Sequence, residues 1–215
     1  LSMETRWDPL TQRSVRILNL PIQKFDLWDM QEMLQKGGPQ VCPFCPEVLE
    51  KLTPQFPPAF FPEGRMRRGE ACLFPNRIAF DKYCAVVVMG KQHYVPLSDF
   101  NEDLLFDAFA VSLSFLRRVL EKDPASEYFS INWNYLPMAG GSIIHPHLQI
   151  LAGAFPTYYQ KTLTRASARY KKRWGTVYWE DLIREEKRLK ERYVGTVGKT
   201  VWLAAFAPLG LTDLM

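Results

Sequence analysis

The sequence predicts an α+β fold in which strands are interrupted by a few long helices. Short runs of β-branched and aromatic residues at 71–74, 84–88 and 127–133 are typical of strands. Residues 102–121 carry the apolar spacing of one long helix. A polar and mostly helical stretch follows after Ala154. Runs of strands and long helices without a regular alternation favour the α+β class.

The N-terminal quarter mixes turns with one strand and one helix. Residues 6–11 predict a turn, and residues 15–18 predict a short strand. Apolar residues on one face predict a helix over 26–36, which a Gly-Gly-Pro sequence ends. Residues 53–69 are rich in proline and aromatic side chains, and we interpret them as ordered but irregular.

The long helix at 102–121 has clear boundaries. Ser98 or Asn101 can cap its N-terminus, where Glu102 and Asp103 suit the positive end of the helix dipole. An Asp-Pro sequence ends it. Its apolar residues are Leu105, Phe109, Leu113, Phe115, Leu116 and Leu120.

The polar stretch after Ala154 is interpreted as solvated helices. Glu186 and Lys190 are spaced as an i, i+4 ion pair. The cationic run at 165–173 is more typical of a solvated helix face than of a polyanion site. Strand-like residues return at 196–208.

The composition is ordinary for a globular protein and decides little about function. The 215 residues are 47% hydrophobic and 23% charged, and the net charge of +4 suits an anionic small molecule as well as nucleic acid. Four cysteines do not suggest a secreted disulfide scaffold. We find no signal peptide and no long apolar span, and we therefore expect a cytoplasmic protein without a membrane partner.

The densest chemistry lies at residues 140–150, which hold two of the three histidines of the chain. Pro146 stands between His145 and His147 and favours an extended backbone. Because alternate residues of a strand share a face, we expect both imidazoles and Gln149 on one surface. The opposite, buried face would carry Ile144, Leu148 and Ile150.

Cys42 and Cys45 form a CxxC pair with three open interpretations: two zinc ligands, a redox dithiol or merely buried thiols. C-P-F-C resembles a glutaredoxin-type motif, but that motif follows a buried strand, and residues 36–40 are typical of a loop. Zinc needs about four ligands, and His93 with one histidine of the H-P-H sequence would complete a Cys2His2 set. We favour zinc.

A histidine of the H-P-H sequence is suited to attack on phosphorus. A neutral imidazole is nucleophilic near neutral pH, provided that one ring nitrogen is free and the other donates to a fixed acceptor. Gln149 could donate its amide to a nonbridging phosphate oxygen. Gly140 and Gly141 would let backbone amides approach a phosphate.

Three motifs together resemble one known family. They are Arg6-Trp7-Asp8-Pro9-Leu10-Thr11, Phe74-Pro75-Asn76, and the ordered set Asn134, Gly141, Ser142, His145, Pro146, His147 and Gln149. The sequence resembles the galactose-1-phosphate uridylyltransferase family, a branch of the histidine triad superfamily, over nearly the whole chain. This resemblance implies a histidine-triad-like antiparallel sheet flanked by helices. It also implies the first of two tandem similar halves, with residues 1–193 as the N-terminal transferase domain. Residues 194–215 would open a second similar domain that is largely absent.

The resemblance also implies roles for individual residues. Cys42, Cys45, His93 and His145 would bind a structural zinc ion. His147 would be the nucleophile, and Gln149 and Ser142 would hold the phosphates. Asn76, Asn134, Gly141, Arg13 and Arg16 would line the nucleotide and diphosphate site. No glutamate lies between His147 and Tyr178, so we expect no second metal ion.

The implied reaction is ping-pong transfer of a nucleoside monophosphate, UMP or AMP, between a nucleotide sugar and a sugar 1-phosphate. Leu148 replaces the glycine of the H-G-Q sequence of bacterial galactose-type enzymes. The resulting H-L-Q sequence is more similar to that of relatives that handle adenine nucleotides. Two alternatives stay open. One is a phosphorylase or hydrolase of ADP-sugars or dinucleoside polyphosphates, and the other is a zinc-stabilised nucleotide-binding module without turnover. A homodimer is expected by analogy, and a nucleic-acid partner is not.

Overall fold

The computed structural model describes residues 3–18, 42–210 and 213–215. The helix predicted at 26–36 lies outside these residues. The chain divides into two compact units: unit 1 comprises Leu1–Phe25 with Pro156–Met215, and unit 2 comprises Asp26–Phe155. The expected boundary after residue 193 and a second similar half at 194–215 both stay predictions.

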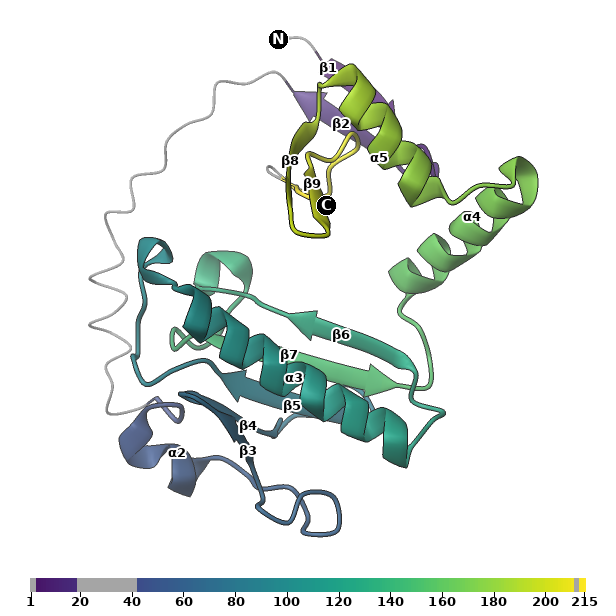
Figure 1. Ribbon diagram of the computed structural model, residues 1–215. Coiled ribbons are helices and arrows are strands. Elements are labelled where there is room, and N and C mark those ends of the chain that lie inside the picture. The colour runs from purple at the N-terminus through teal and green to yellow at the C-terminus, as the bar shows by residue number, and fades with distance from the viewer. Residues whose placement is uncertain (1–2, 19–41, 211–212) are drawn as a thin grey trace. The chain divides into compact units, whose positions relative to one another are not determined.

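Unit 2 is built on a five-stranded antiparallel sheet with the strand order β3-β4-β5-β7-β6 (Figure 1). The α+β class and the antiparallel sheet are thereby confirmed. The strands are β3 (Met66–Arg68), β4 (Ala71–Pro75), β5 (Tyr83–Val88), β6 (Tyr128–Asn132) and β7 (His147–Gly153). Short 3-10 helices occur at Leu97–Asp99 and Pro137–Ala139.

The strand β7 lies between β5 and β6, and its residues alternate between the two faces of this sheet. Leu148 and Ile150 are fully buried in the main core. His147 pairs with Val88 of β5, and Gln149 pairs with Val86. Both valines belong to a second hydrophobic cluster on the opposite face. His147 and Gln149 therefore share that second face, because side chains alternate along a strand.

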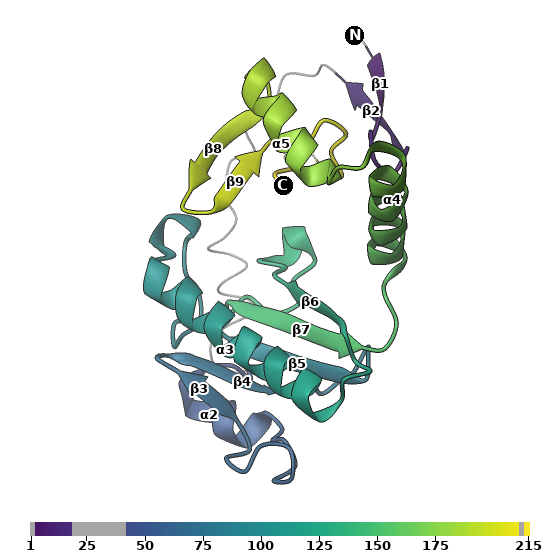
Figure 2. The same cartoon turned by 45° about the vertical axis from the view of Figure 1, so that its right-hand side comes forward.

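Helix α3 (Glu102–Lys122) lies across the first face of the sheet (Figures 1 and 2). Its N-cap is Asn101, whose side chain accepts a hydrogen bond from Leu104 N at 2.9 Å. Phe115 and Val119 are fully buried against the sheet. The predicted helix is confirmed, but half of its predicted apolar residues point outward. Phe109, Leu113 and Leu120 are 37%, 48% and 41% exposed, because the sheet covers only one side of the helix.

The second face of the sheet is covered by the CxxC segment and α2 (Pro46–Leu52), a helix that the sequence analysis missed. Phe44 and Leu49 are buried there against Phe74. The helix is only seven residues long, too short for its apolar spacing to stand out. This cover encloses the second face around His147.

Residues 53–69 are ordered, as predicted, but they are not wholly irregular. They end in β3, which pairs with β4 at the edge of the sheet. Phe56 and Phe61 are buried with a ring-centroid distance of 4.9 Å and pack on Phe115 of α3. Aromatic packing explains why a proline-rich segment has a defined conformation.

Unit 1 contains the hairpin of β1 (Met3–Trp7) and β2 (Ser14–Leu18), whose predicted turn is held by Asp8. The Asp8 Oδ1 atom accepts hydrogen bonds from Leu10 N at 3.1 Å and Thr11 N at 2.6 Å. The Leu10 side chain is buried against Ala166 and Tyr178. The strand β1 was not predicted, because two of its five residues overlap the turn motif.

The remainder of unit 1 consists of α4 (Tyr158–Trp174), α5 (Tyr178–Leu189) and the hairpin of β8 (Tyr193–Val197) and β9 (Thr200–Leu203). The predicted Glu186–Lys190 ion pair is wrong. The Glu186 side chain is buried and accepts a hydrogen bond from Arg192 Nε at 2.7 Å, while Lys190 ends α5 with φ +58°. Among the described residues, no helix combines the length and the apolarity needed to cross a bilayer.

Candidate functional site

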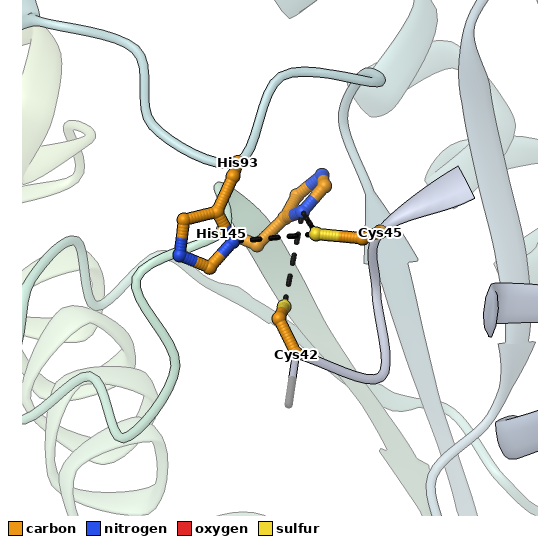
Figure 3. Close-up of side chains that lie close together, drawn as sticks. All are labelled: Cys42, Cys45, His93 and His145. Atoms are coloured by element: carbon orange, nitrogen blue, oxygen red, sulfur yellow. Dashed lines mark hydrogen bonds between the residues drawn. The ribbon is translucent and has the colours of Figure 1, made fainter. Parts of the chain in front are cut away.

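Four potential metal ligands converge in unit 2 (Figure 3). They are Cys42, Cys45, His93 and His145, and their donor atoms all lie within 4.8 Å of one another. The Cys45 Sγ atom is 3.4 Å from His93 Nδ1 and 3.8 Å from His145 Nδ1. The Cys42 Sγ atom is 3.9 Å from the same His145 nitrogen. The structure thus brings the whole predicted ligand set together.

The donor distances fit a single metal ion. A tetrahedral zinc ion with two sulfur and two nitrogen ligands requires donor separations of roughly 3.3–3.8 Å. Three sulfur–nitrogen separations of 3.4, 3.8 and 3.9 Å lie within this range or just above it. Two thiolates and two imidazoles also form a closed set suited to zinc. These residues could therefore hold one metal ion without a large rearrangement.

Three separate segments supply the ligands. Cys42 and Cys45 lie in the turn before α2, and the Cys45 backbone N–H donates to Cys42 O at 3.3 Å. His93 lies in the loop that follows β5, and His145 stands two residues before β7. Ligands from a turn, a loop and a strand entry can cross-link parts of the chain that are distant in sequence.

His145 is held by a second contact outside the ligand cluster. Its Nε2 atom is 2.8 Å from Gly90 O, and because a carbonyl only accepts, Nε2 carries the proton. The Nδ1 lone pair is therefore left facing the two cysteines. His145 is fully buried, and burial lowers the pKa of its imidazole, which favours the neutral, ligating form.

The environment of Cys45 does not favour the redox interpretation. Burial raises the pKa of Cys45 to about 12, and the adjacent Cys42 adds to this increase. Reactive redox thiols have a lowered pKa, because the thiolate is the attacking species. A bound cation would instead stabilise both thiolates at neutral pH.

His147 has one nitrogen fixed and the other free. Its Nδ1 atom is 2.8 Å from the backbone carbonyl of His145, so Nδ1 carries the proton. Nε2 then bears the lone pair and has no hydrogen-bond partner among the described residues. The residue is 7% exposed, and burial lowers the pKa of its imidazole, with partial opposition from the bond to His145. A neutral imidazole with a free Nε2 is the form required of a nucleophile.

The predicted strand is correct in its core but begins later than expected. It starts at His147, so His145 precedes it rather than sharing a regular face with His147 and Gln149. Ile144 is half-buried and is not part of the main core, unlike Leu148. The reason is tertiary, since the side chain of His145 turns toward the cysteine turn instead of following the sheet.

The loop before β7 contains three of the predicted substrate-binding residues. Ser142 and Asn134 are exposed, while Gly141 is buried. A Cβ atom on Gly141 would lie 2.4 Å from Asn134 O, so only glycine fits this close approach of two loop segments. Close packing of the loop thus explains the glycine at position 141 without any contact to a phosphate. The proposed phosphate contacts of Ser142 and Gly141 stay predictions.

The other predicted binding residues occupy separate places. Asn76 directly follows β4, and its Oδ1 atom accepts a hydrogen bond from Ile78 N at 3.1 Å. Arg13 and Arg16 belong to the hairpin of unit 1, and Arg13 Nη2 donates to Ala207 O at 2.5 Å. Their roles beside a nucleotide stay predictions.

Two contributors to the site were missed from the sequence. The Gly90 carbonyl orients His145, and a backbone carbonyl leaves no mark in a sequence. The Phe44 ring packs against His147 with a centroid distance of 5.2 Å. Its position between two cysteines could have suggested a packing role, because such a residue must lie beside the ligands.

Two pockets of the described residues lie away from this cluster. One of about 510 Å³ belongs to unit 1 and is lined mainly by α5, and also by Asp8, Tyr170 and Met215. One of about 540 Å³ lies in unit 2 beside Arg65 and Arg117. Neither is lined by a predicted site residue, so the candidate site rests on its chemistry and not on cavity size.

We compared the sequence and the structure with those of known proteins. No protein-family model matches the chain. An uncharacterized protein of Archaeoglobus fulgidus is 37% identical over 211 residues, which cover 97% of this chain and 61% of the relative. The chain therefore spans less than two thirds of the length of this relative.

Solved structures of GalT-like proteins are similar over almost the whole chain. A GalT-like protein of Arabidopsis thaliana has a TM-score of 0.63 at 18% identity, covering 96% of this chain and 64% of its own. An ADP-glucose phosphorylase of the same plant, solved with bound ADP-glucose, has a TM-score of 0.61 at 17% identity, with coverages of 96% and 65%. A uridylyltransferase has a TM-score of 0.59 at 21% identity, with coverages of 94% and 61%. The chain has the fold of the GalT-like proteins, as its sequence motifs implied.

Proposed function

We propose that the protein transfers a nucleoside monophosphate through a covalent nucleotidyl-histidine on His147. The carrying observation is the hydrogen bond of 2.8 Å from His147 Nδ1 to the His145 carbonyl, which leaves Nε2 as a free lone pair. The low exposure of the ring and its lowered pKa keep the imidazole neutral near pH 7. This is the state in which a histidine attacks phosphorus.

The first half-reaction forms one bond and breaks another. His147 Nε2 attacks the α-phosphorus of a nucleotide sugar, and the bond from that phosphorus to the bridging oxygen breaks. A sugar 1-phosphate leaves with the electron pair. The imidazole becomes positively charged, and its Nδ1–H bond to the His145 carbonyl stabilises that charge. Gln149, on the same sheet face, is proposed to donate its amide to a nonbridging oxygen.

The second half-reaction depends on the acceptor. A sugar 1-phosphate would make the protein a hexose-1-phosphate uridylyltransferase-like enzyme, and inorganic phosphate would make it a phosphorylase. Both kinds of structural relative support the proposal: one is a uridylyltransferase, and the other is an ADP-glucose phosphorylase with ADP-glucose bound. UMP and AMP are therefore both candidates for the transferred group.

We assign a structural zinc ion to Cys42, Cys45, His93 and His145, which the donor distances support. When bound, the ion supplies a cross-link between the cysteine turn, the loop after β5 and the entry to β7. The side chain of His145 faces this cluster while its carbonyl holds His147. The ligand set thus supports the nucleophile without taking part in the transfer.

The proposal is tested by intact-protein mass spectrometry after brief incubation with UDP-glucose or with ADP-glucose, kept free of acid. We expect a mass increase of one UMP or one AMP, and its size names the base. His147→Asn should abolish the increase while retaining about one zinc ion per chain, because asparagine leaves the four ligands in place. Adding glucose 1-phosphate or inorganic phosphate to the isolated adduct then identifies the acceptor that discharges it.

An absence of adduct with both donors, in protein shown to hold zinc, would contradict covalent transfer by this chain. Retained nucleotide affinity in that case would support the binding module instead. An adduct that survives in His147→Asn would contradict the assignment of the nucleophile. A reversible Cys42–Cys45 disulfide in place of bound zinc would support the redox interpretation.

A further inference from the structure

Phe44 lies between the two cysteines of the ligand cluster and contacts the proposed nucleophile. Its side chain is buried, and its ring centroid is 5.2 Å from that of His147 with an interplanar angle of 64°. It is also 6.3 Å from the ring of His145, at an angle of 81°. One aromatic side chain thus touches both a predicted metal ligand and the residue proposed to attack phosphorus.

The hydrogen bond of His147 does not by itself fix the ring. The χ2 torsion of a histidine is broad and roughly two-fold. A half-turn of the ring would therefore place a ring carbon where Nδ1 now lies. Such a rotation would break the Nδ1 contact with His145 O and direct Nε2 elsewhere. An edge-on aromatic neighbour restricts this rotation, because the turning imidazole would collide with it.

Phe44 is itself held firmly in place. Its ring packs on the ring of Phe74 in β4 at a centroid distance of 5.7 Å, so the sheet supports one side of the Phe44 ring. Its backbone is part of the turn closed by the hydrogen bond from Cys45 N to Cys42 O. A metal ion bound by both cysteines would fix this turn further. The position of the Phe44 ring therefore depends on the ligand cluster.

We propose that Phe44 is a positioning residue that couples the metal centre to the orientation of His147. Closure of the cysteine turn would place the Phe44 ring against the imidazole and hold Nε2 in one direction. The effect on nucleotidyl transfer rests on the proposed function. The effect on the imidazole does not, because it concerns the substrate-free protein.

The test compares Phe44→Leu with Phe56→Leu in zinc-loaded protein. Phe56 is a phenylalanine of unit 2 that is as buried as Phe44, but it belongs to the main core and its ring contacts are with Phe60, Phe61 and Phe115. The chain has only three histidines, so nitrogen-15 NMR can resolve each imidazole. We expect His147 to be a pure Nδ1–H tautomer in the wild type and in Phe56→Leu. In Phe44→Leu we expect a mixture of tautomers with zinc still bound, and Phe44→Tyr should restore the wild-type spectrum.

The second readout is the rate of adduct formation. Misorienting a nucleophile slows attack without weakening ligand binding, and we expect about a tenfold slower adduct in Phe44→Leu at unchanged nucleotide affinity. An unchanged tautomer in Phe44→Leu would overturn the proposal, and so would equal losses in both leucine variants. Loss of zinc from Phe44→Leu alone would also overturn it, because Phe44 would then act on the metal turn only. If the wild type forms no adduct, the proposed function fails and the spectra still decide the role of Phe44.

Discussion

His145 has two functions in the H-P-H sequence, one through its side chain and one through its backbone carbonyl. The His145 side chain faces the cysteines, and its carbonyl accepts the Nδ1–H of His147 at 2.8 Å. Pro146 has a fixed φ, which restricts the backbone between the two histidines. Because one residue separates the two histidines, the carbonyl of His145 can reach Nδ1 of His147 and thereby sets the tautomer of that ring.

Substitution of Gly141 tests how closely the loop before β7 is packed. We expect Gly141→Ala to destabilise unit 2 by about 1–3 kcal/mol, because the new Cβ atom meets backbone oxygen and the loop must shift. That atom would lie 2.4 Å from Asn134 O and 3.1 Å from Leu136 O. Urea unfolding, followed by hydrogen exchange of unit 2 amides, measures the loss.

Gly140 provides the neighbouring control for this prediction. Its φ of +84° is unfavourable for alanine, but nothing lies within 4 Å of the added atom. Gly140→Ala should therefore cost only the backbone strain, about 1 kcal/mol. If Gly141→Ala were as stable as the wild type, the close approach of the two loop segments would be contradicted.

At the scale of single elements, helix α3 shows how a boundary residue is selected. Two residues could have capped it, and the structure identifies Asn101, whose Oδ1 atom accepts from Leu104 N. Ser98 instead donates to Asp99 Oδ1 in the preceding 3-10 helix. We expect Asn101→Ala to destabilise unit 2 by about 1 kcal/mol, because one backbone donor loses its partner.

Ser98→Ala is the matched variant for the cap. It removes an exposed side-chain hydrogen bond, so its effect on the free energy of unfolding should be close to zero. Exchange of the first-turn amides of α3 in increasing urea distinguishes the two variants. Equal effects would show that the helix is capped by neither side chain alone.

At the scale of the whole molecule, all four predicted metal ligands belong to unit 2. We expect about one zinc ion per chain and expect its removal by a chelator to loosen unit 2 selectively. Hydrogen exchange should accelerate in peptides over 42–52, 89–97 and 143–150, because the metal would cross-link these segments. Peptides over 178–203 belong to unit 1 and should not change.

Cys45→Ser is the control for chelation, since it removes one ligand without a chelator. It should reproduce the same pattern of faster exchange and lower the zinc content. Uniform acceleration across both units would contradict a metal confined to unit 2. Unchanged exchange in all three segments would contradict a structural metal altogether.

Much of unit 2 could be predicted from local sequence. The strands at 71–74 and 84–88 are predicted correctly because each is a continuous apolar run, and the helix at 102–121 is predicted correctly because it is long enough to show its period. The short elements α2 and β3 were missed, since seven and three residues carry too little pattern. The Glu186–Lys190 pair failed because burial of Glu186 beside Arg192 outweighed helical spacing.

The sequence by itself predicted the residue types of the candidate site. The spacing of cysteine and histidine left open which histidine of the H-P-H sequence would bind zinc, and the family resemblance implied that assignment and the predicted nucleophile. Only the tertiary structure decided which nitrogen of His147 is free, that His145 precedes the strand, and that Phe44 and the Gly90 carbonyl contact the histidines. The physical reason is that tautomer and ring orientation depend on hydrogen bonds and packing between segments distant in sequence, which no local pattern encodes.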